Sequence, residues 1–526
     1  MPTQPAQPNA GTLLDRLWHW ASATPDKLAV ETLADGQLTY RELAEKSDSF
    51  AAALWRLGIG PGDHIAIQLP SVPEFLVAYY AACRIGAVLT TMHVPYRQEE
   101  LRPMLKFAKA RAAICTVVGA YDAPETMLAL AGEIDSLDHV IVVGNSVREG
   151  CLSFDAMVES GDPTTLPPMP GPNATCTLCF TSGTAAAPKG VERKQGLMAE
   201  NAARFVEMIE MTGDDRVMIA PPLTHVFGLL CSGNAVYCGA TILPVPLFTP
   251  QTYVDFLTTL APTVIYSAPA HLAATLKSGV LDREPPPSVR DVIVGGSICP
   301  PEVARQFEDK LPNGRVGCLF GMTEALLTTQ TDIHGTPEER HGTVGKLADG
   351  LALRIVDDAG NSIEAPDCGE LQLSGYSILS EYCDNPEANA SSFTADGWFR
   401  TGDLAYLDEK GNIVITGRLK DIINRGGIKI NPADIESLLD GHENIIQSAI
   451  VPMPDEVLGE RICLYVVLKP GSTITLEEVL AYLQDRGTAK MRWPERLEIV
   501  DEMPMTPTRK IRKAILITDI RNKMAS

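Results

Sequence analysis

Positive charge is scarce in this 526-residue chain, which carries 44 Lys and Arg against 66 Asp and Glu for a formal net charge of −22. Basic surfaces are what bind nucleic acids and acidic membranes non-specifically, so this balance argues against both as partners. An acidic protein that binds a polyphosphate must gather its cations locally. Each Lys or Arg beside a glycine-rich turn is therefore a candidate ligand for phosphate.

Long apolar runs are also missing. The longest apolar stretch, Val226–Phe248, is interrupted by Asn234, three glycines and two prolines. This pattern predicts strands and turns rather than a membrane span. The first eleven residues are polar and Pro-rich, without the charged-then-apolar pattern of a signal peptide. We therefore expect a cytoplasmic protein.

Cysteine patterns typical of metal sites or disulfide frameworks are missing as well. The 12 cysteines are scattered, and the close pair Cys176 and Cys179 has no second pair to complete a ligand set. Both residues lie in an alternating segment that predicts a buried strand. Reduced thiols in a cytoplasmic protein fit this usage best.

Signatures of several other enzyme classes are absent. Lys189 follows Pro188 where a P-loop has glycine, and no H-E-x-x-H zinc motif occurs. The segment Gly295–Cys299 (GGSIC) fails the last position of the G-x-S-x-G nucleophile elbow. P-loop nucleotidases, zinc proteases of this type and α/β-hydrolases are thereby disfavoured.

What the chain does contain is a repeated strand–helix rhythm, and its length requires more than one core. Thr39 and Glu42 form a capping box for one helix, and Pro73 and Gly86 bracket another. A parallel sheet flanked by helices is predicted twice, once before and once after a Pro-rich connector at 164–172. The expected strands are 63–69, 88–89, 112–115 and 140–143 before the connector, then 175–180 directly before Thr181, and 216–220, 263–266, 291–296 and 315–320.

The pattern changes near Gly345 to short strands with Gly/Asp turns, which predicts a small β-barrel or distorted sheet. A charged break at Gly417–Asp421 (GRLKD) follows, and the rest of the chain has its own α+β rhythm. We therefore predict an N-terminal domain of residues 1–419 and a C-terminal domain of residues 420–526.

The segment Thr181–Gly190 (TSGTAAAPKG) follows a predicted strand. Small residues let backbone N–H groups approach an anion, hydroxyls add donors and Lys189 adds charge, so the segment favours phosphate binding. An exposed polar turn is the alternative when the segment is considered alone.

Six further motifs follow this loop in order: Pro221–Gly228, Gly321–Glu324, Thr401–Asp403, Gly417–Asp421, Gly426–Pro432 and Pro504–Lys510. The set, in this order and spacing, resembles the adenylate-forming superfamily of acyl-CoA synthetases, nonribosomal peptide adenylation domains and beetle luciferases. The resemblance extends from Thr39 to Lys513. It implies an α/β fold: a large N-terminal domain of two α/β subdomains plus a small β-barrel, hinged to a small mobile α+β C-terminal domain.

The resemblance also implies a two-step reaction. A small carboxylic acid is activated on ATP with Mg²⁺, releasing pyrophosphate, and a thiol such as that of CoA then attacks the acyl-adenylate. By this resemblance the phosphate-binding residues are Thr181, Ser182, Gly183, Thr184, Lys189 and Thr323, and the adenine- and ribose-binding residues are Gly295, Gly296, Ser297, Phe320, Gly321, Asp403 and Arg418. Ala185-Ala186 stands where many relatives have Thr-Gly, which predicts a stiffer phosphate loop.

The remaining roles also come from the resemblance. Glu324 is expected to hold Mg²⁺, as a hard carboxylate suits it. Lys510 is the expected catalytic residue, since an ammonium would stabilise the charge that gathers during adenylation. His225 is expected at the carboxylate pocket, although a lone His is more often structural. Lys420 is the predicted hinge, and Gly426 and Gly427 the predicted thiol tunnel.

The acceptor and the acid are less well defined. The segment Pro95–Leu101 (PYRQEEL) resembles the branch of cyclohexanecarboxylate-CoA ligases and 2,3-dihydroxybenzoate adenylating enzymes. Residues 511–526 leave no room for a carrier domain, so we expect a free-standing CoA ligase. The alternative is a stand-alone adenylating enzyme that loads a carrier protein, and a catalytically silent nucleotide-binding protein is a third. A homodimer is a further possibility that the motifs do not decide.

Overall fold

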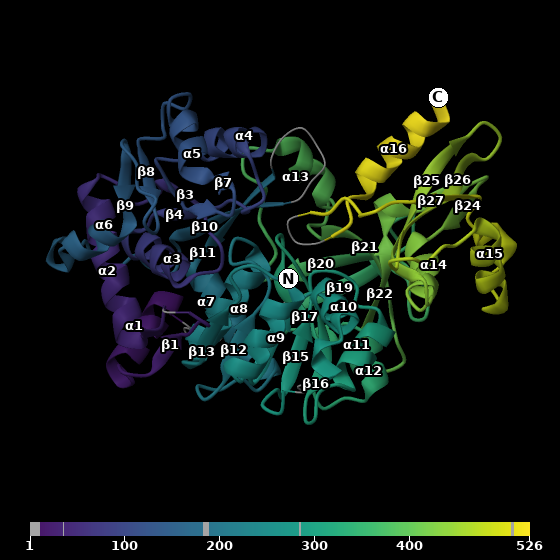
Figure 1. The fold of residues 1–526 in the computed structure, drawn as a ribbon, viewed down its shortest axis with the longest axis horizontal. Helices are drawn as coiled ribbons and strands as arrows, with labels where there is room; N and C mark the ends of the chain where they lie inside the picture. The colour runs from purple at the N-terminus through teal and green to yellow at the C-terminus, as the bar shows by residue number, and fades with distance from the viewer. Residues whose placement is uncertain (1–10, 35, 182–188, 283–285, 507–509, 526) are drawn as a thin grey trace.

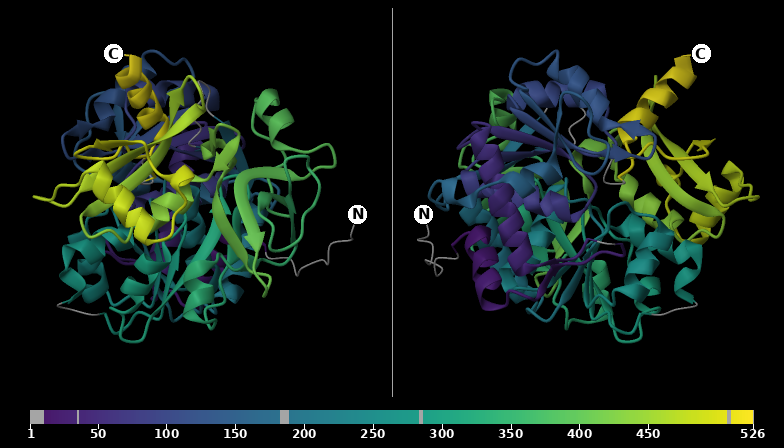
Figure 2. Two further views of the ribbon diagram at one scale, coloured as in Figure 1. Left: turned by 90° about the vertical axis from the view of Figure 1, so that its right-hand side faces the viewer. Right: turned by 60° about the vertical axis from the view of Figure 1, so that its left-hand side comes forward.

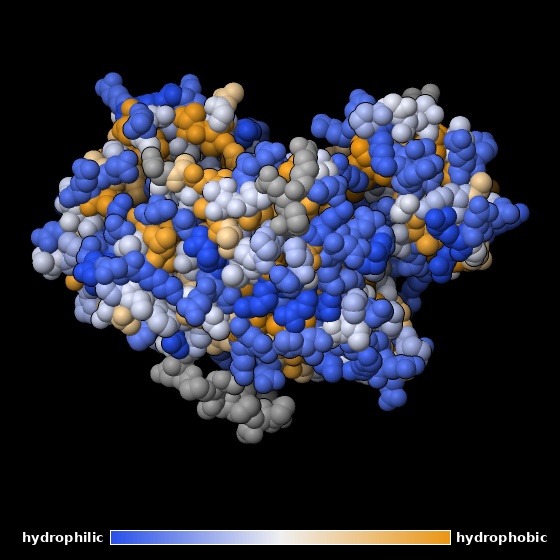
Figure 3. All heavy atoms as spheres, turned by 60° about the horizontal axis from the view of Figure 1, so that its bottom comes forward, coloured by the Kyte–Doolittle hydropathy of each residue, from blue (hydrophilic) through white to orange (hydrophobic). Residues whose placement is uncertain are grey.

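The computed structural model describes residues 11–34, 36–181, 189–282, 286–506 and 510–525. Figures 1 and 2 show a large body, coloured purple to green, and a smaller C-terminal part in green and yellow set against one end of it. None of the helices in the described residues has the length and apolar character needed to cross a membrane. On the face drawn in Figure 3, hydrophobic side chains form scattered groups among hydrophilic ones.

The first subdomain is built on a seven-stranded sheet in the order β11-β10-β4-β3-β5-β8-β9. Every neighbouring pair is parallel except β10 and β11. Its strands are β3 His64–Gln68, β4 Val88–Thr91, β5 Ala112–Cys115, β8 His139–Val142, β9 Cys151–Ser153, β10 Thr175–Thr181 and β11 Lys189–Lys194, with the small hairpin β6 Val117–Val118 and β7 Tyr121–Asp122. Its helices are α2 Tyr40–Arg56, α3 Pro73–Ile85, α4 Gln98–Ala108, α5 Ala123–Ala131, α6 Phe154–Ser160 and η1 Pro163–Thr165.

The second subdomain is built on a nine-stranded sheet in the order β18-β17-β16-β15-β14-β12-β13-β1-β2. Its strands are β1 Leu28–Val30, β2 Leu38–Thr39, β12 Arg216–Ile219, β13 Thr241–Pro244, β14 Val264–Ser267, β15 Asp291–Val294, β16 Arg315–Met322, β17 Leu326–Gln330 and β18 Lys346–Leu347. Its helices are α1 Leu13–Ala23, α7 Gln195–Met208, α8 Val226–Cys238, α9 Pro250–Thr259, α10 Pro269–Ser278, η2 Val280–Asp282, α11 Pro301–Glu308 and α12 Pro337–Gly342. The strands from β16 to β1 are parallel, as the sequence predicts.

Local signals placed several helix ends correctly. Thr39 Oγ1 accepts from Glu42 N at 3.2 Å, and Glu42 Oε2 accepts from Thr39 N at 2.8 Å, which is the predicted capping box at the start of α2. Pro73 begins α3, and Gly86 ends it in the left-handed region with φ 74°. The two signals act within one turn of the chain, so no tertiary contact is needed to recognise them.

The prediction of strands and turns across Val226–Phe248 is wrong, because its first half forms the buried helix α8. Gly228 is a packing glycine: a Cβ there would lie 2.3 Å from Pro222 O, so the helix can approach that backbone closely. Gly239, with φ 81°, is the residue that ends the helix. In the sequence, glycines inside this segment look like ends of secondary structure. In the fold they allow α8 to pack closely in the core shared by the two sheets.

A four-stranded antiparallel sheet occupies the place of the predicted barrel, with β19 Leu351–Val356, β20 Gly369–Gly375, β21 Phe399–Leu407 and β22 Ile413–Arg418 in sequential order and α13 Pro386–Ser392 beside it. The C-terminal part has its own five-stranded sheet. It contains η3 Leu419–Asp421, β23 Ile423–Arg425, β24 Ile428–Ile430, α14 Pro432–Leu439, β25 Ile445–Asp455, β26 Gly459–Leu468, α15 Leu476–Asp485, η4 Lys490–Arg492, β27 Arg496–Ile499 and α16 Lys513–Ala525. The boundary at Lys420 stays a prediction.

Polar contacts join the C-terminal part to the large body. Lys277 Nζ on α10 donates to Ile446 O at 2.5 Å, and Lys429 forms an ion pair with Asp358. The latter pair is exposed on both sides, so it contributes little to stability. These contacts define one orientation of the C-terminal part against the body.

Candidate active site

The carboxyl ends of the two parallel sheets converge on one region. His225 lies between β12 and α8, Gly295 directly follows β15, and His93 follows β4 of the other sheet. Ligands of open α/β sheets bind outside the carboxyl ends of the strands. The region is completed by β21 and β22 and by Lys510 of the C-terminal part.

Close backbone packing explains the glycines predicted beside the adenine ring. A Cβ on Gly295 would lie 2.5 Å from Leu319 Cδ1, and one on Gly321 would lie 2.5 Å from Leu326 O. Gly296 has a φ of 89°, which also requires glycine. The exposed Ser297 follows it, and Phe320 lies next to Gly321 on the neighbouring strand β16. The structure therefore brings these five predicted residues to one edge of the sheet.

Asp403 and Arg418 form an ion pair across β21 and β22. Arg418 Nε lies 2.8 Å from Asp403 Oδ1. Asp403 is 3 % exposed, and its Oδ2 is buried without a hydrogen-bond partner among the described residues. Burial raises the pKa of Asp403, and the positive charges of Arg418 and Lys510 oppose that rise. The ion pair therefore leaves Asp403 Oδ2 as an unused acceptor that is buried away from water.

Lys510 is hydrogen-bonded to Thr506 in the C-terminal part. Lys510 N donates to Thr506 Oγ1 at 2.9 Å, and Thr506 N donates to Lys510 O at 2.7 Å. Burial, followed by the positive charge of Arg418, lowers the pKa of Lys510 to about 8, while Asp403 and Glu324 oppose the decrease. The structure therefore places this lysine close to the predicted ribose and metal residues.

Glu324 lies in the turn between β16 and β17 and is 8 % exposed. The hydroxyl of Tyr382 donates to Glu324 Oε1 at 2.8 Å. Burial and the negative charge of Glu324 raise the pKa of Tyr382, so its phenol stays protonated and donates. Oε2 receives no hydrogen bond from the described residues and is available to a cation.

The two ends of the predicted phosphate loop lie side by side. Thr181 ends β10 and pairs with Lys189 at the start of β11. Lys189 Nζ lies 5.1 Å from the centre of the Tyr382 ring, which connects the loop base to the Glu324 contact. The predicted ligands Ser182, Gly183 and Thr184, and the Ala185-Ala186 substitution, lie outside the described residues.

Arg193 is a buried residue of the site that the sequence analysis did not identify. It is 1 % exposed, donates from Nη1 to Ser377 O at 3.0 Å, and donates from Nη2 to the carbonyl of Thr323. Burial lowers its pKa to about 10, which leaves it charged at neutral pH. Arg193 thus fixes the backbone of the predicted phosphate residue Thr323. No local sequence motif indicates this contact.

His225 caps helix α8. Its Nδ1 accepts from Phe227 N at 3.2 Å, which leaves Nε2 to carry the proton of a neutral ring. Removal from water, then the charges of His93 and Lys510, hold the pKa of His225 well below its usual value. The predicted pocket residue is therefore a neutral imidazole near Lys510.

The residues predicted as hinge and thiol tunnel are on the surface. Lys420 is exposed in η3, one residue after Leu419 and two after Arg418. Gly426 and Gly427 are exposed in the turn between β23 and β24, with φ of 58° and 88°. Their hydrogen-bond partners, Leu458 O and Asn424 Oδ1, belong to the C-terminal part. In this orientation the charge of Lys510 acts on Asp403.

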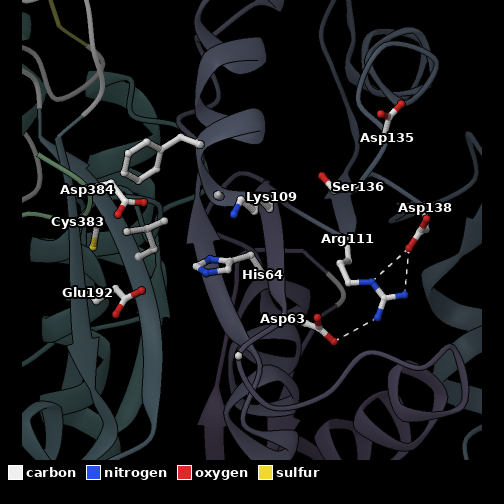
Figure 4. Close-up of a pocket in the computed structure, with 14 residues that line it drawn as sticks. Asp63, His64, Lys109, Arg111, Asp135, Ser136, Asp138, Glu192, Cys383 and Asp384 are labelled. Carbon is white, nitrogen blue, oxygen red and sulfur yellow. Dashed lines mark hydrogen bonds and ion pairs between the residues drawn. The ribbon is translucent and has the colours of Figure 1, made fainter.

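A separate open groove of about 510 Å³ lies at the opposite, amino edge of the seven-stranded sheet. Figure 4 shows Arg111 between Asp63 and Asp138, with Glu192 and Asp384 across the groove. None of the predicted site residues lines it. The carboxyl edge, where the predicted residues gather, remains the candidate site.

Comparison with known proteins assigns the family. The model for "AMP-binding enzyme" matches residues 17–383, and that for "AMP-binding enzyme C-terminal domain" matches residues 434–510. The chain therefore belongs to the AMP-binding enzymes, the adenylate-forming superfamily, as the ordered motifs predict.

Two curated relatives cover nearly the whole chain. A medium-chain fatty-acid–CoA ligase of Escherichia coli (strain K12) is 31 % identical over 520 residues, covering 98 % of this chain and 91 % of the relative. A salicyl-AMP ligase / salicyl-S-ArCP synthetase of Mycobacterium tuberculosis is 34 % identical over 508 residues, covering 94 % and 88 %. The two differ in their acid and in their acceptor.

Solved structures share the fold. ATP-bound MatB from Rhodopseudomonas palustris superimposes with a TM-score of 0.88 at 27 % identity, covering 98 % of this chain and 100 % of that one. The anthranilate CoA ligase AuaEII in complex with anthranoyl-AMP superimposes with a TM-score of 0.92 at 22 % identity, covering 99 % of both chains, and at this identity it shows the fold alone. The two-domain organisation and the mixed α/β fold are confirmed.

Proposed function

We propose that this protein is an AMP-forming carboxylic acid–CoA ligase. The acid's carboxylate attacks the α-phosphorus of ATP, which forms the acyl-adenylate and releases pyrophosphate. The thiol of CoA then attacks the acyl carbon, which forms the thioester and releases AMP. The observation that carries the proposal is the approach of Lys510 to Asp403, whose Oδ2 is buried and unused.

Asp403 and Arg418 have the chemistry of a ribose site. A carboxylate with one oxygen engaged by Arg418 can accept from a sugar hydroxyl through the other, and the half-exposed guanidinium can donate to the same sugar. Lys510, positively charged below a pH of about 8, would stabilise the charge that gathers at the α-phosphate. Lys189 at the loop base would contact the departing pyrophosphate.

Glu324 fits Mg²⁺. Among the described residues no group of three or more His, Cys, Asp or Glu side chains could hold a metal, and Glu324 is the carboxylate that would bind the ion. A single carboxylate suits Mg²⁺, which proteins usually bind through one or two carboxylates together with substrate phosphates. When bound, the ion would neutralise phosphate charge, and Tyr382 would keep the carboxylate oriented.

The acceptor follows from the relatives. The Escherichia coli relative is named as a CoA ligase, while the Mycobacterium tuberculosis relative is named for transfer to a carrier protein. Loading of a carrier-protein phosphopantetheine is therefore the alternative. The hinge at Lys420 would let Gly426 and Gly427 replace Lys510 at the site for the second step. The homodimer and the cytoplasmic location stay predictions from the sequence.

The test is pyrophosphate release with ATP, Mg²⁺ and a panel of acids that includes octanoate, salicylate and cyclohexanecarboxylate, followed by CoA and a holo-carrier protein as acceptors. We expect pyrophosphate with at least one acid and thioester with CoA. Thioester with the carrier alone would support the alternative. Failure to release pyrophosphate with any acid would support a silent nucleotide-binding protein.

A further inference from the structure

A second histidine, His93, packs against His225, the predicted pocket histidine. His93 follows β4 of the first subdomain, and His225 precedes α8 of the second. Their ring centres lie 5.9 Å apart with 24° between the ring planes, a stacked arrangement. Neither the motifs nor the proposed chemistry assigns a task to His93.

One hydrogen bond alone leaves the ring of His225 free to tilt. Its Nδ1 is occupied by the N–H of Phe227, so the ring can pivot about that contact. Nε2 carries the proton and has no hydrogen-bond partner among the described residues. A second constraint on the ring face is needed to aim Nε2 in one direction.

His93 is itself held firmly. Its Nδ1 lies 3.0 Å from Thr224 Oγ1, the residue before His225. Its carbonyl accepts from Gln68 Nε2 at 3.0 Å, and Gln68 is 1 % exposed. The rings of His93 and Tyr96 meet edge to face, with their centres 5.2 Å apart. His93 is therefore an anchored flat surface behind His225.

The charges around the pair favour two neutral rings. Removal from water lowers the pKa of His93 to about 4. Lys510, which approaches from the C-terminal part, disfavours a second positive charge on His225. Tyr96 lies on the loop of His93, and burial raises its pKa, so its phenol is neutral as well.

We propose that His93 is a positioning residue for acid activation, which stacks on His225 and aims its Nε2–H at the substrate carboxylate beside Lys510. This inference rests on the proposed function, because it assumes that the carboxylate binds there. The contact also joins the two subdomains across the site, since the two histidines come from different sheets.

Four variants test it: His93→Ala, His93→Phe, His225→Ala and the double variant His93→Ala/His225→Ala. We expect His93→Ala to lower kcat/KM for the acid about tenfold, because this is about the largest effect of losing one aromatic contact. The KM for ATP should stay within about twofold of the wild-type value. His93→Phe keeps a flat stacking ring and should recover most of the loss. In the His225→Ala background, His93→Ala should change little, because the ring it positions is gone.

His64→Ala is the matched control. His64 is also a partly buried histidine of this subdomain, with its Nδ1 2.9 Å from Thr90 Oγ1, but it lies at the opposite edge of the sheet. It should leave kcat/KM for the acid unchanged. Melting temperatures of all variants report any general loss of folding.

Each outcome decides the question. A tenfold loss that persists in the His225→Ala background, or an equal rise in KM for ATP, overturns the positioning role. An active wild type with an unaffected His93→Ala overturns this inference alone. A wild type that releases no pyrophosphate with any acid overturns the proposed function and this inference with it.

Discussion

Asp403 and Arg418 face each other on paired strands, and their ion pair uses only one of the two carboxylate oxygens. The other oxygen, Oδ2, is buried without a partner among the described residues. A buried acceptor without a hydrogen bond is costly, and a ligand that supplies the donor would remove that cost. A ribose hydroxyl is that donor in the function proposed above.

Asp403→Asn should weaken ATP binding about 10–100-fold, because hydrogen bonds to a charged group contribute about that much to affinity. The amide keeps the size of the side chain, but it has a single acceptor oxygen and no charge for Arg418. Calorimetric titration with ATP measures the change. Asp358→Asn, an exposed carboxylate, is the control and should bind ATP as the wild type does. Unchanged affinity in Asp403→Asn would remove Asp403 from the ribose site.

Adenylation should decline on the alkaline side because Lys510 has a pKa of about 8. The ammonium is present below that pH and is lost as the pH rises through it, so kcat/KM for pyrophosphate release should fall above pH 8. Lys510→Arg keeps its charge at all accessible pH values and should lose this decline, while Lys510→Ala should lose about 10²–10³-fold in rate.

The pH profile is measured by pyrophosphate release between about pH 6 and 9.5. Lys513→Arg is the control, because Lys513 forms an ion pair with Glu436 at 2.7 Å and should not affect the profile. An alkaline decline that survives in Lys510→Arg would assign it to another group. Lys510→Ala should still transfer the acyl group from a preformed adenylate to CoA.

Lys420→Pro should affect the two half-reactions unequally. Proline fixes φ near −65°, and the C-terminal part already has Lys510 near Asp403 in this structure. We expect adenylate formation to persist and thioester formation to slow by about tenfold, equivalent to about 1.4 kcal/mol of barrier. Single-turnover assays separate the steps, with Lys420→Ala as the control that leaves φ free. Equal losses in both steps would contradict a hinge at this residue.

Glu324→Gln should raise the Mg²⁺ concentration needed for half-maximal rate by about 10–100-fold. The amide oxygen can still accept from Tyr382, so the side chain keeps its place while its charge is removed. A Mg²⁺ titration at fixed ATP measures this. Tyr382→Phe removes the orienting hydroxyl and should give a smaller increase. The same Mg²⁺ dependence in Glu324→Gln and wild type would exclude Glu324 as the ligand.

Local signals in the sequence predicted much of the fold. The capping box of Thr39 and Glu42 predicts the start of α2, and Pro73 and Gly86 predict both ends of α3, because each signal acts within one turn. The sequence does not predict helix α8, because Gly228 looks like a helix-breaking residue. Only the fold shows the backbone of Pro222 packed against it. A packing glycine and a turn glycine are identical in sequence.

The candidate site, like the fold, could be predicted from the sequence only in part. The ordered motifs predicted Asp403, Arg418, Glu324 and Lys510 as one group, and the structure brings these four close together. Residues that support them carry no motif. Arg193 reaches Thr323 across 130 positions of the chain, and Tyr382 reaches Glu324 across 58.

By itself the sequence determined the class of chemistry, the family and the residues that could carry out the reaction. It did so because these depend on residue types in a fixed order. The tertiary structure alone decided that Asp403 Oδ2 is unused, that His225 is neutral, and that His93 stands behind it. Burial and contacts between distant segments set those properties, and both arise only when the two parallel sheets, the four-stranded sheet and the C-terminal part meet.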